Sequence, residues 1–421
     1  MVALRVALTV FVLVALNGSS PGTAMYAGAD GADRPAVLVN PKAANGGTAR
    51  TIQEGIDMAA PGGKVLVLPA TYPERLIVTK GVTIEAIGGR SGDVVIAPPG
   101  VPDSTIEIQT TEPVVLRGLT VYAPGFNGIR GVGPVDLTVE STAVVAVNPP
   151  AGTSVLILVA HDAADGTRAR LVVRDSFIDG AIANVVPPPP VQSFGLRPQG
   201  DVDALLERNV IRRLGGACIF TVTRADLGGE LNVDILNNDL DQCHPIGRVA
   251  AIIVGPLAAN QPTAARPLTA TGVVNVIGNT FRNTSLHCLS NAIDYEVYTG
   301  RIERNTIVDF VQPCAAQAGR VRPSAIWIGR LTPPATMFPF PPVTPSVRFN
   351  DIVGNAQAGL RIAPNQTIPI EASCNYWGSE LGPSGVGTGN GDAILVDTGG
   401  AMPFFTPFAT APIAARSQPG C

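Results

Sequence analysis

One short phrase of apolar and polar positions, apolar-x-x-Asn-x-apolar, recurs through the C-terminal half of the chain. It occupies residues 206–211, 235–240, 276–281, 302–307, 347–352 and 372–377, which places Asn209, Asn238, Asn279, Asn305, Asn350 and Asn375 at equivalent positions. A weaker copy at 172–177 has Asp175 in that position, and a fainter one lies around 118–120. The closest copies are 25 residues apart, which predicts a repeating unit of about 25 residues with occasional insertions.

A second phrase follows several of these asparagines and alternates apolar residues with others, at 251–255, 292–296, 325–329 and 359–362. Alternation with a period of two is typical of short strands. Asparagine tolerates left-handed turns, and its side-chain amides can hydrogen-bond along a stack of equivalent turns. A unit of this size cannot bury its apolar face alone, so the units must stack. The pattern predicts an all-β fold, a right-handed parallel β-helix.

The two ends of the chain carry different signals. Residues 51–60 indicate a helix with Thr51 as N-cap and Glu54 three residues later, and we expect it to cover the open first coil. The repeat breaks after Gly385, where three phenylalanines are available to cap the last coil: Phe404, Phe405 and Phe408. The expected organisation is a signal peptide (1–27), an N-terminal cap region (28–63), the β-helix (64–384) and a C-terminal cap or tail (385–421).

The N-terminus also indicates the compartment. Arg5 is followed by an apolar run over residues 6–16 and then by small residues. This run is shorter than the roughly 20 residues of a membrane span but fits a secretory signal. We therefore expect a secreted protein, extracellular or periplasmic, with no integral membrane segment after cleavage. The net charge of -4 is not segregated along the chain, which argues against nucleic acid as a partner.

Six cysteines lie in the C-terminal half: Cys218, Cys243, Cys288, Cys314, Cys374 and Cys421. Export favours disulfides, but the sequence alone does not decide how they pair. A rival interpretation is a metal site formed by Cys243-His244 and His287-Cys288. If the cysteines form disulfides, we expect no metal or other cofactor.

Two groups of motifs resemble known families. Residues 51–56, 61–67 and 70–74 are similar to the first coil of pectin methylesterases, with Ala70 where glycine is usual. Residues 375–379 and 382–384 resemble a terminal-coil motif of exported β-helix proteins, including the NosD type. The chain thus resembles the pectin-lyase-like superfamily, with its parallel β-helix (PbH1) repeats, over almost its whole mature length. The resemblance implies the fold and hardly the activity, because the catalytic motifs of methylesterases and polygalacturonases do not occur and the central coils contain no lysine.

Aligning the second phrase across coils suggests where a site would lie. Ile253, Asp294, Trp327 and Arg361 fall in one register and should point outward, about 4.8 Å apart on successive coils. Asp294 and Glu296 are two residues apart on one face, about 7 Å, within the range of the acid–base pair of inverting glycosidases. These two carboxylates are the candidate catalytic residues.

Four further residues are candidates for substrate binding. Trp327 offers a stacking platform and Arg361 a clamp, and Tyr298 and Arg330 lie close to them in the sequence. The insertions 257–270 and 331–345 could wall a groove beside the row. We therefore expect a protein that binds, and as an enzyme would cleave, an extended polysaccharide or cell-surface glycan, either as a glycoside hydrolase or as a lyase for which calcium could serve.

Other interpretations remain open at this point. The same carboxylates suit an ordinary solvated strand face, and the absence of catalytic motifs favours a non-catalytic envelope scaffold or adhesion protein. A periplasmic metal-delivery accessory of the NosD kind is a weaker alternative. His161 has no acidic or nucleophilic neighbour in the sequence pattern and is expected to be incidental.

Overall fold

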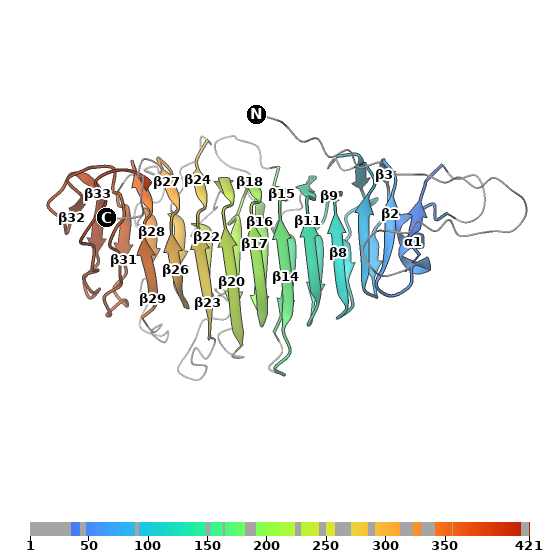
Figure 1. Ribbon diagram of the computed structural model, residues 1–421, viewed down its shortest axis with the longest axis horizontal. Coiled ribbons are helices and arrows are strands. Elements are labelled where there is room, and N and C mark those ends of the chain that lie inside the picture. The colour runs from blue at the N-terminus through green and yellow to red at the C-terminus, as the bar shows by residue number, and fades with distance from the viewer. Residues whose placement is uncertain are drawn as a thin grey trace, which may run out of the picture.

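Three long parallel sheets form the molecule, and the chain winds through them coil after coil (Figure 1). The computed structural model describes residues 35–42, 48–88, 92–148, 152–162, 165–181, 191–223, 229–243, 250–256, 271–284, 291–311, 323–329, 342–355, 357–413 and 421. The expected signal peptide lies outside these residues. Within them, no helix has the length and apolar character needed to cross a membrane.

Sheet A has eleven strands. In spatial order they are β1 (Val37–Val39), β2 (Gly63–Val67), β5 (Val82–Ala86), β8 (Pro113–Arg117), β11 (Asp136–Glu140), β14 (Ala169–Arg174), β17 (Val202–Glu207), β20 (Glu230–Leu236), β23 (Thr271–Ile277), β26 (Thr299–Glu303) and β29 (Thr344–Arg348). Buried and more exposed residues alternate along most of these strands, so the buried positions form the interior face.

Sheet B has ten shorter strands. They are β3 (Ala70–Tyr72), β6 (Val94–Ile96), β9 (Thr120–Ala123), β12 (Ala143–Ala146), β15 (Phe177–Asp179), β18 (Val210–Leu214), β21 (Asp239–Cys243), β24 (Thr280–Arg282), β27 (Thr306–Val308) and β30 (Asp351–Val353). Each strand follows a strand of sheet A after a turn of a few residues.

Sheet C has twelve strands. From one end they are β4 (Leu76–Val78), β7 (Ser104–Ile108), β10 (Asn127–Val132), β13 (Gly152–His161), β16 (Val191–Gly200), β19 (Ile219–Thr223), β22 (Ala250–Pro256), β25 (Asn291–Tyr295), β28 (Ser324–Ile328), β31 (Leu360–Ile362), β33 (Gly391–Val396) and β32 (Pro383–Gly385). The described strands therefore reach beyond residues 64–384 at both ends, because β1 pairs with β2 and β33 pairs with β31.

The path of the chain explains why the sequence repeats. The chain passes from sheet A to B to C and back to A, so each coil pairs in parallel with the next one along all three sheets. A large buried cluster of mostly Val, Ile and Leu runs the length of the stack, and a second, small cluster forms around Phe194 and Phe220. The fold is the right-handed parallel β-helix that the sequence predicts.

A ladder of buried asparagines joins the coils at the turn between sheets A and B. The backbone N–H and the Nδ2 of Asn279 both donate to Oδ1 of Asn305, at 3.0 and 3.1 Å, and Asn238 donates to Asn279 in the same way. The ladder runs through all six predicted residues: Asn209, Asn238, Asn279, Asn305, Asn350 and Asn375. The predicted stacking of side-chain amides is confirmed.

Two details of that prediction were wrong. The left-handed residue is the one before each asparagine, as at Arg208 (φ 53°) and Arg304 (φ 56°), so the asparagine supplies the hydrogen bonds and its neighbour makes the turn. In the weaker copy, Ser176 and not Asp175 takes the asparagine position, because the N–H of Ser176 donates to Oδ1 of Asn209 at 3.1 Å. Asp175 is itself the left-handed residue of that coil (φ 52°).

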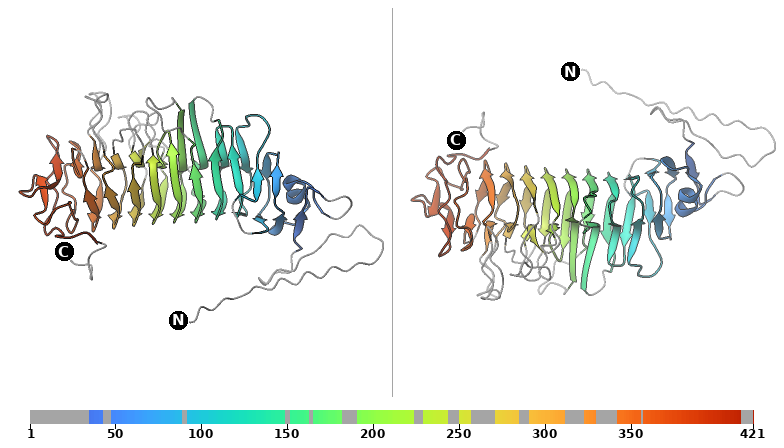
Figure 2. Two further views of the ribbon diagram at one scale, coloured as in Figure 1. Left: turned by 90° about the horizontal axis from the view of Figure 1, so that it is seen from above. Right: turned by 90° about the horizontal axis from the view of Figure 1, so that it is seen from below.

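The predicted capping helix is α1 (Ile52–Met58), at the blue end of the stack in Figures 1 and 2. The N–H of Glu54 donates to the Thr51 hydroxyl at 3.1 Å, which confirms the N-cap. The carboxylate of Glu74 accepts the backbone N–H groups of Ile52 and Gln53, at 2.8 and 2.9 Å. These donors have no partner within the helix, so a carboxylate there stabilises the helix start.

The far end of the stack is closed by chain that follows the last repeat. Phe405 and Phe408 pack against the core, whereas Phe404 is 61% exposed. Residues around Phe404 and Ala409 make isolated parallel bridges to the coil at Glu371 and Tyr376. Two of the three phenylalanines thus contribute to the cap.

Two disulfides occur among the described residues. Cys218 bonds to Cys243 within the central coils, and Cys374 bonds to Cys421. Cys288 and Cys314 lie outside the described residues. The disulfide of Cys243 removes one of the four ligands of the alternative metal site, and no cluster of metal-ligating side chains occurs in the described part of the chain.

Candidate functional site

The outer face of sheet C carries the row of residues that the sequence placed in register. Ile253 pairs with Asp294, Asp294 with Trp327 and Trp327 with Arg361 on four adjacent strands. Their sequence neighbours are fully buried on the interior side: Ile252, Ile293, Ile326 and Leu360. We call residues in this register the outer row of sheet C. The predicted register is confirmed, whereas the catalytic and binding roles remain predictions.

Asp294 and Glu296 lie on the same outer side. Asp294 is half-buried on β25, and Glu296 follows the end of that strand with similar exposure. The backbone N–H of Glu296 continues the sheet pairing by donating to Val254 at 2.8 Å. A Cβ added at Gly255 would lie 3.1 Å from Oε2 of Glu296, so the neighbouring glycine leaves room for the Glu296 side chain.

Trp327 and Arg361 are both largely enclosed. Trp327 is only 6% exposed. The guanidinium carbon of Arg361 lies 5.7 Å from the centre of the Trp327 ring, and Arg361 Nη2 lies 2.7 Å from Oδ1 of Asp397. This ion pair is itself largely buried, with side-chain exposures of 12% and 6%. The guanidinium group of Arg361 is therefore already paired with the carboxylate of Asp397.

Two further predicted binding residues are placed differently. Tyr298 does not continue the outer row, because its backbone turns left-handed (φ 79°) after β25 and its side chain is buried in the core cluster. Arg330, the whole insertion 257–270 and residues 331–341 of the insertion 331–345 lie outside the described residues. Asp294, Glu296, Trp327 and Arg361 are thus brought together on one face, and Tyr298 is not.

The outer row continues toward the N-terminal end, where the sequence analysis did not follow it. Glu107 pairs with Arg130, Arg130 with Leu158 and Leu158 with Arg197 on β7, β10, β13 and β16. These coils lack the asparagine phrase, so they could not be aligned with the later repeats. The alternation of outward residues within each strand was the signal that could have found them.

A hollow of about 550 Å³ opens beside Glu107 and Arg130. It is lined by Glu107, Ile108, Gln109, Thr110, Thr111, Arg130, Val132, Pro134 and Val135. A hydrogen bond from Gln109, then ion pairs with Arg75 and Arg130, hold the pKa of Glu107 below its usual range. Glu107 therefore carries a negative charge at neutral pH.

Further along the row, Arg197 is half-buried against an aromatic ring. Its guanidinium carbon lies 5.6 Å from the centre of Phe220, and its Nη2 donates to Gln199 at 2.7 Å. Gln199 in turn donates to Asp162 at 2.7 Å. Burial lowers the pKa of Arg197.

The expectation that His161, at the end of β13, has no acidic neighbour was wrong. Its Nε2 lies 2.7 Å from Oγ1 of Thr167 and 3.7 Å from Oδ1 of Asp165, and the side chain is 3% exposed. The Thr167 hydroxyl also bonds to Asp165 at 2.6 Å. His161 thus contacts the chain segment at Asp165 and Thr167.

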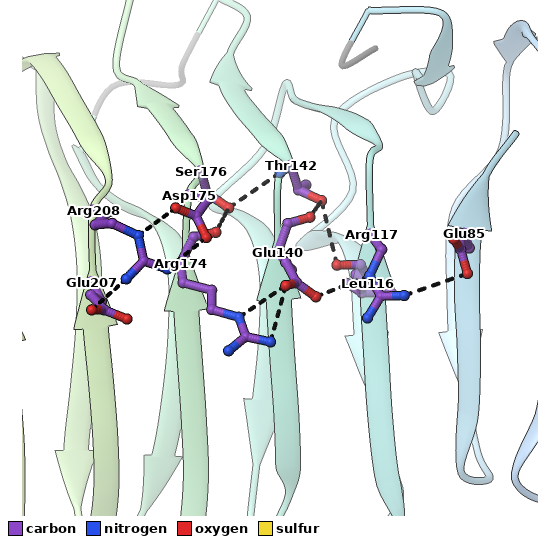
Figure 3. A network of polar contacts seen from close by, with 10 residues as sticks. All are labelled: Glu85, Leu116, Arg117, Glu140, Thr142, Arg174, Asp175, Ser176, Glu207 and Arg208. Carbon is purple, nitrogen blue, oxygen red and sulfur yellow. Dashed lines mark hydrogen bonds and ion pairs between the residues drawn. The ribbon is translucent and has the colours of Figure 1, made fainter. Parts of the chain in front are cut away.

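The outer face of sheet A also carries a row of ion pairs, which runs from β5 to β14. Glu140 on β11 lies between Arg117 on β8 and Arg174 on β14, with N–O distances of 2.9 and 3.0 Å (Figure 3). Glu85 and Glu207 extend the same register on either side, so acidic and basic residues alternate from strand to strand. These charges are therefore already paired within the protein.

No protein-family model matches the chain, and no curated protein sequence matches it. Among solved structures, the chain is similar to a lacto-N-biosidase from Eubacterium ramulus (11% identity, 90% of this chain and 67% of that chain, TM-score 0.46). It is also similar to a pectin methylesterase from Erwinia chrysanthemi (13% identity, 66% of this chain and 80% of that chain, TM-score 0.32). A third similar structure is an alginate lyase solved with a trisaccharide (12% identity, 93% of this chain and 89% of that chain, TM-score 0.34). The three parallel sheets of this chain form a parallel β-helix.

Proposed function

We propose that this protein is exported and binds an extended polysaccharide along the outer face of sheet C. The observation that carries the proposal is the register of the outer row, which sets charged and apolar side chains side by side from β7 to β31. Parallel strands place these side chains at steps of about 4.8 Å, so a polymer lying across the strands can contact many of them.

Asp294 and Glu296 are the residues to which we assign bond cleavage if the bound glycan is hydrolysed. Their separation of about 7 Å suits one carboxyl group as general acid and the other as general base for a water molecule. The enclosed Trp327 and Arg361 then shape the floor of the face beneath the ligand. Tyr298 would support this floor from within the core. Arg330 is assigned to substrate binding from its position in the sequence alone.

The proposal is tested with the mature protein and a panel of neutral and acidic polysaccharides, with and without calcium. Retention on insoluble glycans and release of reducing ends are measured in parallel. We expect binding to at least one glycan, and we expect Asp294→Asn and Glu296→Gln to abolish any release of reducing ends while retaining binding. Glu303→Gln on the outer face of sheet A is the matched control and should change neither.

Absence of retention on every glycan would contradict the proposal. Unsaturated products in place of simple reducing ends would retain the binding role and reassign the chemistry to elimination.

A non-catalytic scaffold is the second candidate function. It is favoured by the buried ion pair between Arg361 and Asp397 and by the burial of Trp327, because these residues cannot then serve an open groove. In that case the β-helix displays its loops to a protein or cell-wall partner. Glycan binding that is insensitive to substitutions along the whole outer row of sheet C would favour this function.

A further inference from the structure

The hollow beside Glu107 and Arg130 has the size and the lining of a small-ligand site. Its volume of about 550 Å³ lies within the range of ligand pockets, which is roughly 300–1,000 Å³. It lies at the end of the outer row, on β7 and β10 and on the turns that follow them. All of its lining residues belong to the described part of the chain.

The polar part of the lining is arranged for hydroxyl groups. The Glu107 carboxylate lies 3.1 Å from Nε2 of Gln109 and 3.4 Å from Nη1 of Arg130. Thr110 and Thr111 add two hydroxyls. Carboxylate, amide and guanidinium groups offer acceptors and donors side by side, which is what adjacent hydroxyls of a sugar ring need.

The apolar part of the lining is equally specific. Val132 is 52% exposed although it lies in a strand, and Pro134 follows it in the same wall. An exposed valine on an outward position is not explained by packing within the fold. Together with Pro134, it offers an apolar surface to the C–H face of a sugar ring.

The charges of the hollow favour an uncharged ligand. Arg130 and Arg75 both form ion pairs with Glu107. A ligand carboxylate at this place would compete with Glu107 for Arg130 and would lie close to its negative charge, which is unfavourable. A hydroxyl group can instead donate to Glu107 and accept from Arg130 without displacing either ion pair.

We propose that this hollow binds one uncharged pyranose unit of the polysaccharide, as a subsite remote from Asp294 and Glu296. The inference rests on the proposed function of sheet C, which it extends by a ligand class and a length requirement. Five strand steps separate Arg130 from Asp294 in the outer row, a distance of about 24 Å. A glycan must span this distance to occupy both places, so affinity should rise sharply once the oligosaccharide is long enough.

The experiment measures affinity by calorimetry for neutral cello-, xylo-, laminari- and galacto-oligosaccharides of increasing length, with oligogalacturonates as the charged probe. Val132→Glu places a charge in the hollow, and Val273→Glu is the matched control at a 40% exposed valine of sheet A. We expect Val132→Glu to weaken binding of long neutral oligosaccharides by about tenfold or more. Short oligosaccharides and the thermal midpoint should be unchanged, and Val273→Glu should bind like the wild type.

Three outcomes would overturn this inference. Equal affinity of Val132→Glu and the wild type for long oligosaccharides would remove the hollow from the binding face while leaving the proposed function intact. If the wild type bound oligogalacturonates more tightly than neutral oligosaccharides, and Val132→Glu weakened that binding, the uncharged ligand class would be contradicted. Wild-type protein that binds no oligosaccharide of any length would overturn the subsite and the proposed function together.

Discussion

Gln53 on α1 and Ile77 on β4 are joined by two hydrogen bonds of the kind that a neighbouring strand would make. The N–H of Ile77 donates to Oε1 of Gln53 at 2.8 Å, and Nε2 of Gln53 donates to the Ile77 carbonyl at 3.1 Å. Because β4 is the edge strand of sheet C among the described strands, no strand of this part of the chain pairs with these backbone groups on that side. The capping helix therefore covers the apolar end and also satisfies the exposed strand edge.

Removing this amide should weaken the N-terminal end. We expect Gln53→Met to lower the free energy of unfolding by about 1–2 kcal/mol, because two backbone groups of β4 lose their partners. Gln53→Glu retains an acceptor for the Ile77 N–H and should have a smaller effect near neutral pH. Denaturant unfolding measures both changes, and light scattering reports any association through the uncovered edge. Equal stability of the three proteins would show that water replaces the amide at no cost.

A substitution in the middle of the asparagine ladder should strongly lower the free energy of unfolding. In Asn279→Ala, Asn238 loses the acceptor for both its backbone N–H and its Nδ2 in a fully buried turn. We expect a loss of about 3 kcal/mol in the free energy of unfolding, because buried donors without partners are costly. Asn275→Ala, at a partly exposed position of sheet A, is the control and should cost less than about 1 kcal/mol. Similar losses for the two variants would contradict a special role of the ladder.

Each single ion pair in the charged row of sheet A should contribute little to the free energy of unfolding. Glu140→Gln removes a partly exposed partner of Arg117 and Arg174, and we expect a change below about 1 kcal/mol. Glu140→Lys should be more harmful, because it places a third cation between two arginines. A double-mutant cycle on Glu140 and Arg174 measures the coupling at low and at high salt. A coupling that does not fall with salt would argue against a surface electrostatic origin.

Acid should weaken the end of sheet C that carries Glu107. The bond from Gln109, with the ion pairs to Arg75 and Arg130, lowers the pKa of Glu107 in the folded state. Its contribution to stability is therefore present above the pKa of the unfolded state and is lost as the pH falls through the lower folded pKa. We expect the difference in unfolding midpoint between the wild type and Glu107→Gln to shrink below roughly pH 4. A difference that is constant from neutral pH to strong acid would contradict this linkage.

The disulfide between Cys218 and Cys243 should stabilise the central coils. It closes a loop over a sequence separation of 25 residues, for which chain-entropy estimates give about 3 kcal/mol. We expect the double variant Cys218→Ser, Cys243→Ser to unfold at a lower denaturant concentration. Non-reducing peptide mapping checks the pairing directly. A peptide that links Cys218 to any other cysteine would contradict the structure.

Much of the fold could be predicted because stacking imposes a local pattern that the sequence must repeat. The equivalent asparagines, the period-two strands and the Thr51 helix start each depend on neighbours within a few residues. The register of Asp294, Trp327 and Arg361 was also predictable, since strands of one sheet repeat at the same point of each coil. The sequence analysis placed Asp175 at the asparagine position, but the structure has Ser176 there. The repeat identifies the coil, whereas the exact residue at each position of a turn is set by the hydrogen bonds between coils.

The tertiary structure alone decided which of these residues remain open to a ligand. Asp397 lies 36 residues after Arg361 and neutralises it, and no local pattern relates the two. The burial of Tyr298 depends on a single left-handed residue, and the hollow at Glu107 forms only where turns from different coils meet. The sequence by itself determined the stacked coils and the outward row, because these follow from short-range periodicity. Exposure, ion pairing and the shape of the hollow depend on contacts between distant coils, and those exist only in the folded chain.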